Sequence, residues 1–533
     1  MTRPVHAAAR GPVRTAPPEP TAARSRGNSR GARARSARLL WNPWLVPALV
    51  TFALGTYGAS RPGMWQDELA TWASASRSTR DLLGMLHNVD AVHGAYYLLI
   101  HEWIRAFGDS LTSMRMPGVL AVTGAAVCVA LTGQRLFGPR SGLAAGLLFA
   151  VIPAVSRYAQ EVRSYALVAG AVAAATLFLF RALEQPTWPR WLGYVSCLSA
   201  AGAFHLASLT FLSGHAVVVL LRWRDGRDAR LPLRWLVSVT AAAASLLPLV
   251  LLGQRQLHRQ LGWIERPTFA KTWRMWPELF YSTPASLVLL VLALLPLLQR
   301  RRRPAVEAAL LAVLPLVVLW AVSHGEISYW LNRYLFFTVP AWAVLAGAGA
   351  AALRPRLLTV GALVLVTAVG VPDQRFVRQA DSHSWYSYPM AVPYGGSPST
   401  PDFMGAGAVI AQGRRPGDGI VYSRGPWFDH YLDAGVRYAL PRSLDMRDVF
   451  LAESAAHRRD LWTLECSNSA KCLGDEPRLW VVTLGSVPER ADRRLDGSDI
   501  KLIKPEIDAL NQAYEVERIV QLRDVTVTLM VRR

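Results

Sequence analysis

The chain has 533 residues, of which 52% are apolar and only 18% are charged. Lysine and arginine (58) outnumber aspartate and glutamate (37), which gives a net charge of +21. The charged residues lie between long uncharged runs, and this distribution is typical of a polytopic membrane protein. It explains the basic balance without a nucleic-acid partner, and we expect none.

Residues 1–40 form the first segment. They contain nine arginines, one acid and many Ala, Pro, Gly and Ser residues. This composition predicts a disordered cytoplasmic tail that can lie against anionic lipid head groups. The apolar run that follows is about one span long and is not followed by a cleavage site and a soluble chain. We therefore interpret it as a retained helix rather than a signal peptide.

Ten runs without Asp, Glu, Lys or Arg predict the membrane-spanning helices, because most approach the roughly 20 residues that cross about 30 Å of hydrocarbon. The run 191–221 is flanked by arginines on both sides, which predicts a helical hairpin with His205 near its outer tip. About eleven spans result, in a core of residues 41–372 whose outer loop is 61–115. The runs are 41–60, 116–133, 141–156, 164–180, 191–221, 235–254, 281–299, 308–325, 334–353 and 357–372.

The outer loop carries the first candidate site. Asp67 and Glu68 lie a few residues after the first predicted span, and His93 and Tyr96 lie farther along the same loop. Carboxylates beside a bilayer are expensive and tend to mark functional sites, where they accept a proton or hold a cation. The alternative is that Gln66 and Asp67 only cap a helix over residues 68–76.

A short turn between the third and fourth predicted spans carries the second candidate site. Arg157 and Arg163 lie in this turn with Gln160 and Glu161, and the two arginines predict an anion site. A later connection supplies Arg333 and Tyr334, and residues 254–280 add an excess of positive charge. The alternative for each cluster is a set of arginines and aromatics that snorkel to the membrane interface.

These motifs resemble those of glycosyltransferase family 39, the protein O-mannosyltransferase and aminoarabinose-transferase-like group of GT-C enzymes. The segment Tyr158-Ala159-Gln160-Glu161-Val162-Arg163-Ser164-Tyr165-Ala166-Leu167 is close to the Gln-Glu-Ala-Arg-x-Tyr-Ala-Leu signature of bacterial members. Further matches are Asp67-Glu68, Arg115-Met116-Pro117, Arg135-Leu136-Phe137-Gly138, Phe204-His205 and Asn332-Arg333-Tyr334-Leu335. Many relatives carry His-Pro-Pro where this chain has His93-Gly94-Ala95, and the loss of both prolines loosens the turn that carries His93.

The resemblance implies a polyprenyl-phosphate sugar donor, with mannose as the first choice, and transfer with inversion to a lipid, glycan or protein acceptor on the outer face. Asp67 is then the candidate base, and Glu68 orients the acceptor or holds a cation. No cofactor is required, although Glu68, His93 and His205 could hold a divalent cation. The candidate phosphate-binding residues are Arg157, Arg163, Arg333 and Tyr334, and the second-rank residues are His93, Tyr96, Gln160, Glu161 and His205.

Residues 373–533 return to a soluble composition. A helix over 404–412 and strands over 420–422, 479–484 and 525–529 predict one small extracytoplasmic α/β domain, with a role as a lid or in acceptor docking. Cys466 and Cys472 could form a disulfide there, because an extracytoplasmic compartment permits it.

Two other function classes fit a chain of this kind. A lipid or polysaccharide transporter or flippase would place charges within its helices and repeat its two halves, and we find neither pattern. A membrane-anchored sensor would need neither about eleven spans nor an acidic pair. The sequence therefore favours an integral-membrane glycosyltransferase.

Overall fold

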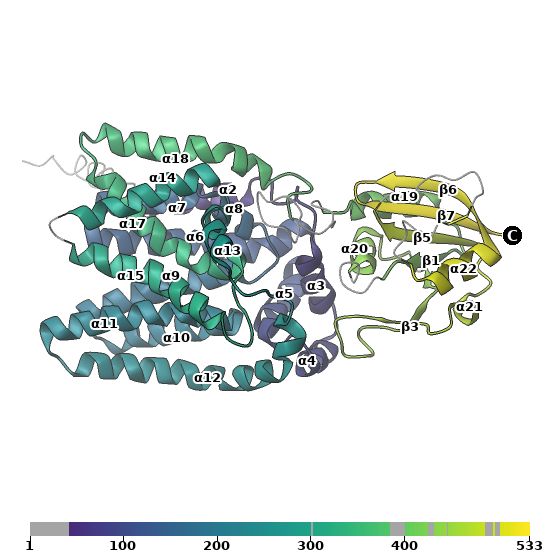
Figure 1. The fold of residues 1–533 in the computed structure, drawn as a ribbon, viewed down its shortest axis with the longest axis horizontal. Helices are drawn as coiled ribbons and strands as arrows, with labels where there is room; N and C mark the ends of the chain where they lie inside the picture. Colours follow the sequence, from purple (N-terminus) through teal and green to yellow (C-terminus); the bar gives the residue numbers. More distant parts are fainter. Residues whose placement is uncertain are drawn as a thin grey trace, which may run out of the picture. The chain divides into compact units, whose positions relative to one another are not determined.

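The computed structural model describes residues 42–299, 302–383, 400–424, 431–444, 446–485, 494–495 and 502–533. The tail predicted over residues 1–40 lies outside this part of the chain. Residues Pro43–Arg533 form one compact unit, which contains a bundle of apolar helices and a C-terminal region with a mixed sheet (Figure 1).

Within the described residues, seven helical segments are long and apolar enough to cross a membrane. They are α6 (Leu111–Phe137), α9 (Tyr165–Glu184), η2 with α11 (Leu206–Phe211 and Leu212–Gly226), α12 (Arg230–Leu261), α15 (Arg303–Val322), α16 through η4 to α17 (Asn332–Leu335, Phe336–Thr338 and Val339–Ala352) and α18 (Leu357–Phe376). The prediction of a polytopic helical membrane protein is confirmed.

Two further segments are bent pairs of helices. α7 (Pro139–Val151) and α8 (Pro153–Ala159) meet at 61°, because Pro153 disfavours a helical conformation for Ile152, which is extended. α13 (Phe269–Phe280) meets α14 and η3 (Thr283–Leu294 and Leu295–Leu298) at 94°, where Tyr281 is left-handed. If each pair is one span, the number of candidate spans rises to nine in the described chain.

Two shorter helices account for the difference between nine candidate spans and the eleven expected. α2 (Leu45–Thr56) has 12 residues and α10 (Trp188–Phe204) has 17. α10 packs against α9 and α12 (Figure 1), and the chain breaks at His205 before η2 and α11. The hairpin predicted over residues 191–221 is therefore present, with His205 at its turn.

The segment 61–115 folds into short helices between α2 and α6, and its last residues belong to the first turns of α6, which begins at Leu111. The short helices are α3 (Gln66–Ala75), α4 (Thr79–Asn88), η1 (Ala91–His93) and α5 (Gly94–Phe107). Ser78 caps α4 by accepting the N–H of Asp81. Asp90, with φ of 62°, adopts the left-handed conformation that turns the chain from α4 into η1.

The C-terminal region contains a five-stranded sheet of order β2-β1-β5-β7-β6. The strands are β1 (Gly419–Tyr422), β2 (Arg447–Asp448), β5 (Arg478–Leu484), β6 (Tyr514–Leu522) and β7 (Val525–Arg532). β1 pairs in parallel with β2 and β5, whereas β7 pairs antiparallel with β5 and β6. The helices of this region are α19 (Phe403–Gly413), α20 (Leu432–Ala439), α21 (Ser469–Cys472) and α22 (Lys504–Ala513).

The predictions for this region are confirmed for one helix and three strands, which correspond to α19, β1, β5 and β7. Val421 and Val481 of the central strands are fully buried, as a sheet covered on both faces requires. A small second sheet pairs β3 (Leu451–Glu453) with β4 (Leu464–Glu465), and the predicted disulfide between Cys466 and Cys472 follows it.

Candidate active site

A cavity of about 1480 Å³ lies where α3, η1, η2, α12, α13 and α16 approach one another. Its size exceeds that of an ordinary small-molecule pocket, roughly 300 to 1,000 Å³. Six residues singled out in the sequence line it: Asp67, His93, Arg163, His205, Arg333 and Tyr334. The fold thus brings together residues from segments that are up to 267 positions apart, counted from Asp67 to Tyr334.

Asp67 and Arg163 form the ionic centre of this cavity. Asp67 lies in the first turn of α3, and Arg163 lies in the segment 160–164 that links α8 to α9. Oδ2 of Asp67 is 3.7 Å from Nε of Arg163, and the Asp67 side chain keeps 19% of its surface exposed. A carboxylate and a guanidinium therefore share one wall of the cavity.

Glu68 does not line the cavity. Its side chain is fully buried, and Nη2 of Arg115 donates to both of its carboxylate oxygens at 3.0 Å. The N–H of Val162 donates to Oε1 at 2.8 Å, and Nδ1 of His383 lies 3.4 Å from Oε2. Glu68 thereby fastens the segment that carries Arg163 onto α3.

The electrostatics of Glu68 follow from these contacts. Burial alone would raise the pKa of the carboxyl group, because an apolar environment disfavours its charge. The charge of Arg115 and the hydrogen bonds from His383 and Val162 outweigh burial and lower the pKa to about 2. Glu68 is therefore held as an anion.

Four more predicted residues also lie outside the cavity lining. Arg157 pairs with Glu161 at 2.8 Å, and Glu161 also accepts the indole N–H of Trp65 at 2.9 Å. Gln160 donates to two backbone carbonyls at the end of α2 and just beyond it. Tyr96 is buried in the core of the segment 61–115. These contacts brace the turn beside Arg163.

Asp90 was not singled out in the sequence, and it joins His93 at the cavity. Nδ1 of His93 lies 2.7 Å from Oδ1 of Asp90, and Nε2 of His93 lies 2.9 Å from Nη2 of Arg163. Asp90 also accepts hydrogen bonds from Tyr97 and Gln260. Burial alone would raise its pKa, but His93, Arg163 and Tyr97 together lower it to about 2.

The residues around Arg333 make an aromatic wall. Its guanidinium lies 5.5 Å from the ring centre of Trp65 and 5.9 Å from that of Trp263, within the range of cation–π attraction. The rings of His205 and Tyr334 meet edge to face at 4.3 Å. Both residues line the cavity, and their contact packs the turn after α10 against α16.

Asn332 offers an unused donor in the same wall. The side chain is 8% exposed, and its Oδ1 accepts the N–H of Arg333 at 2.8 Å. Its Nδ2 is buried and has no hydrogen-bond partner among the described residues. A buried amide without a partner is unfavourable by about 1 to 3 kcal/mol, and a bound molecule with an acceptor oxygen would relieve this.

The C-terminal region also reaches the cavity, through Tyr431, Leu461 and Trp462. Nη2 of Arg77 donates to the carbonyl of Asp460 at 2.7 Å and thus holds the segment that precedes Leu461. Sequence reasoning missed these residues, because nothing in their local pattern indicates a contact with α3 and α5.

In the described part of the chain, no group of three or more His, Cys, Asp or Glu side chains could hold a metal ion. His93 and His205 line the cavity but Glu68 does not, so these three residues do not form a ligand set.

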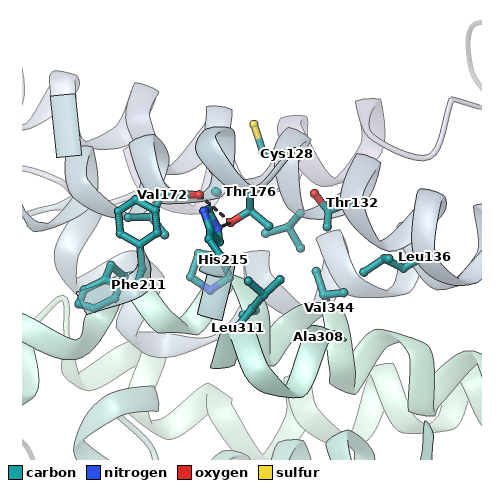
Figure 2. Close-up of a pocket in the computed structure, with 15 residues that line it drawn as sticks. Cys128, Thr132, Leu136, Val172, Thr176, Phe211, His215, Ala308, Leu311 and Val344 are labelled. Carbon is teal, nitrogen blue, oxygen red and sulfur yellow. Dashed lines mark hydrogen bonds between the residues drawn. The ribbon is translucent and has the colours of Figure 1, made fainter. Parts of the chain in front are cut away.

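A second and much smaller cavity of about 30 Å³ lies between membrane helices (Figure 2). His215 is at its edge, where Nδ1 lies 2.9 Å from the Tyr194 hydroxyl and Nε2 lies 3.1 Å from Oγ1 of Thr176. The volume fits about one or two water molecules. None of the residues predicted for the site lines this cavity, which we regard as a packing feature.

Comparisons with known proteins give a family match and a fold match. Residues 95–251 match the family described as dolichyl-phosphate-mannose-protein mannosyltransferase. No curated protein matches the chain. The resemblance stated from the sequence motifs is confirmed.

Solved structures with a similar fold include those of ArnT from Cupriavidus metallidurans. The apo structure has a TM-score of 0.59 at 15% identity, and the match covers 93% of this chain and 98% of ArnT. The structure bound to undecaprenyl phosphate has a TM-score of 0.58 at 14% identity and covers 91% and 97%. The fold is thus shared over nearly the whole length of both chains.

Proposed function

We propose that this chain is a membrane glycosyltransferase of the dolichyl-phosphate-mannose-protein mannosyltransferase family and that it transfers a sugar from a polyprenyl-phosphate donor to an acceptor hydroxyl on the outer face of the membrane. The observation that carries the proposal is the Asp67–Arg163 pair in the wall of a large cavity. Asp67 as the base and Arg163 as the phosphate-binding cation then lie next to each other, as sugar transfer from a phosphate-linked donor requires.

The cavity suits a lipid-linked donor. Arg163 and Arg333 supply guanidinium groups for the phosphodiester, since a planar guanidinium binds phosphate oxygens in a bidentate manner. The apolar part of the lining, which includes Leu206, Val250 and Leu257, can receive the first isoprene units. The ArnT structure of the same fold that holds undecaprenyl phosphate supports this class of donor.

In the proposed reaction, Asp67 takes the proton of the acceptor hydroxyl as its oxygen attacks the anomeric carbon. A new C–O bond forms on one face of the sugar while the bond to the phosphate oxygen breaks on the other, so the configuration inverts. The polyprenyl phosphate leaves as an anion and requires no general acid. Arg163 and Arg333 stabilise the charge that develops on it.

The other predicted residues receive supporting roles. Glu68 is a positioning residue, because its carboxylate is occupied by Arg115 and Val162 and is not exposed to the cavity. Arg157 neutralises Glu161 rather than the donor phosphate. Nδ2 of Asn332 donates to an oxygen of the bound donor. We propose a reaction without a metal cofactor and, following the family description, mannose as the sugar.

The test uses the full-length protein in lipid vesicles with labelled polyprenyl-phosphate mannose, arabinose or glucose. A membrane extract supplies the acceptor, and the release of polyprenyl phosphate together with transfer of label is measured. Consumption of the mannose donor by the parent protein, and its loss in the Asp67→Asn variant, supports the proposal. Preference for another sugar reassigns the donor, and consumption of none of the three contradicts a glycosyltransferase of this type.

A further inference from the structure

The imidazole of His93 lies between Asp90 and Arg163 and contacts both. Nδ1 is 2.7 Å from Oδ1 of Asp90, and Nε2 is 2.9 Å from Nη2 of Arg163. A guanidinium has only donors, so Nε2 of His93 must accept the hydrogen bond from Arg163. The ring proton is then on Nδ1 and is donated to Asp90, so the contact with Asp90 selects the tautomer.

Asp90 is itself held from three directions. Its Oδ2 accepts the Tyr97 hydroxyl at 2.5 Å, and its Oδ1 accepts Nε2 of Gln260 at 2.9 Å as well as Nδ1 of His93. Its backbone is left-handed, which orients the side chain toward η1. These contacts fix the orientation of the Asp90 carboxylate, which in turn fixes the orientation of the His93 ring.

Arg163 is oriented on the far side of His93. Nη1 lies 3.4 Å from the Tyr97 hydroxyl and 3.5 Å from Oγ1 of Thr71, and Nε faces Asp67 at 3.7 Å. The last distance is longer than a hydrogen bond, and among the described residues His93 makes the shortest contact with this guanidinium. Without that acceptor, Arg163 is free to turn toward Asp67 and pair with the carboxylate that the reaction needs as a base.

We propose that Asp90 and His93 are positioning residues that hold Arg163 for the donor phosphate and away from a closer pairing with Asp67. The proposal deepens the proposed function and rests on it, because it assumes that Arg163 binds the phosphate. It assigns a role to Asp90, which no motif in the sequence indicated.

The test is a double-mutant cycle on the full-length protein in lipid nanodiscs, with undecaprenyl phosphate as the probe. His93→Gln keeps an acceptor oxygen near the position of Nε2, whereas His93→Asn reaches only the position of Nδ1. We expect Arg163→Ala and His93→Asn each to weaken binding by about tenfold or more, and His93→Gln by less than about threefold. His93→Asn added to Arg163→Ala should weaken binding no further.

The possible outcomes distinguish the positioning role from the donor site. Normal binding by His93→Asn while Arg163→Ala binds weakly overturns the positioning role and leaves the donor site in place. Additive losses in the double variant also overturn it, since His93 would then act independently of Arg163. Normal binding by Arg163→Ala removes the assumed donor contact and contradicts that part of the proposed function. Thermal unfolding of every variant, with His93→Gln as the conservative reference, shows that a loss of binding is not a loss of fold.

Discussion

Asp67 and Glu68 are consecutive residues of α3 with opposite environments. Asp67 lies at the cavity wall, 3.7 Å from Arg163, whereas Glu68 is fully buried against Arg115. Side chains of consecutive residues in a helix point about 100° apart, so Asp67 faces the cavity while Glu68 faces the protein interior. One carboxylate is available to a substrate, and the other holds the protein together.

The first prediction follows for Asp67. Asp67→Asn keeps the size of the side chain but abolishes proton uptake, so turnover should fall by at least about 100-fold while the melting temperature changes little. The measurement is transfer from the labelled donor by protein in vesicles. Glu102→Gln, which changes an exposed carboxylate on α5, is the matched control and should be as active as the parent. Near-normal turnover by Asp67→Asn would remove Asp67 from the mechanism.

The second prediction concerns the partner carboxylate. Glu68→Gln leaves the buried guanidinium of Arg115 without its counter-charge, and breaking a buried pair in this way destabilises a protein by about 3 to 5 kcal/mol. We therefore expect the melting temperature of the variant in detergent to be lower than that of the parent. Adding Arg115→Met should recover part of the loss, because no buried charge then remains unpaired. A melting temperature equal to that of the parent would show that the pair is not structural.

The third prediction is a dependence of stability on pH. The pKa of Glu68 is lowered from 4.5 to about 2, and that of Asp90 from 3.8 to about 2. A carboxyl group whose pKa is lower in the folded than in the unfolded protein stabilises the fold fully above its ordinary pKa. This stabilisation is lost as the pH falls toward the pKa of the folded protein. The melting temperature should therefore be insensitive to these two groups above about pH 5 and should decline between about pH 4.5 and 2.

Asp90→Asn provides the check on this assignment. The variant lacks one of the two titrating groups, so its melting temperature should fall less steeply with acidification than that of the parent. Equal slopes for the two proteins would show that Asp90 contributes nothing to the acid sensitivity.

The fourth prediction tests the contribution of the C-terminal region to the cavity. Tyr431 lines the cavity from the C-terminal region, whereas the apolar donor residues lie on η2 and α12, so its truncation should disturb the acceptor more than the donor. Tyr431→Ala should raise the amount of acceptor extract needed for half-maximal transfer by about tenfold, with undecaprenyl phosphate binding unchanged. His457→Ala, at an exposed position of the same region, is the control. An equal loss of donor binding would instead place Tyr431 at the phosphate.

The fifth prediction addresses orientation. Nine arginines in residues 1–40 should resist translocation, and an odd number of spans then places the C-terminal region outside. A membrane-impermeant thiol reagent should label Ser443→Cys, at an exposed position, but not Ser25→Cys in intact cells. Cys466 and Cys472, which form the disulfide, are first replaced by serine. Labelling of Ser25→Cys in sealed cells would invert the membrane topology.

The sequence predicted the helical framework well, because long uncharged runs seldom occur outside membrane-spanning helices. It also singled out Asp67, Arg163 and Arg333, which lie in short motifs close to span ends and which the structure places in the cavity lining. It did not separate Glu68 from Asp67, since the burial of Glu68 depends on Arg115, which is 47 positions away. A carboxylate three residues before His93 could have indicated Asp90, but their contact requires a left-handed residue that the sequence does not reveal.

Contacts over greater distances could not be predicted at all. Tyr431, Leu461 and Trp462 reach a cavity that is otherwise built from residues 66–334, and their positions depend on how the C-terminal region packs against the segment 61–115. Hydrophobic periodicity reports which face of an element is buried, but it does not report against which partner. For the same reason the side chain of His383 could not be assigned to Glu68.

The contact of His383 with Glu68 limits how the protein can be shortened for experiment. A boundary drawn by composition at residue 372 would remove His383, and it would also remove Arg378, whose guanidinium donates to the carbonyls of Leu54 and Tyr57 at the end of α2. The residues that follow the last membrane helix thus hydrogen-bond to the end of the first helix and to Glu68. A shortened protein that retains the chain through His383 keeps these hydrogen bonds, whereas one that stops at residue 372 loses the contacts that join the end of α18 to the end of α2.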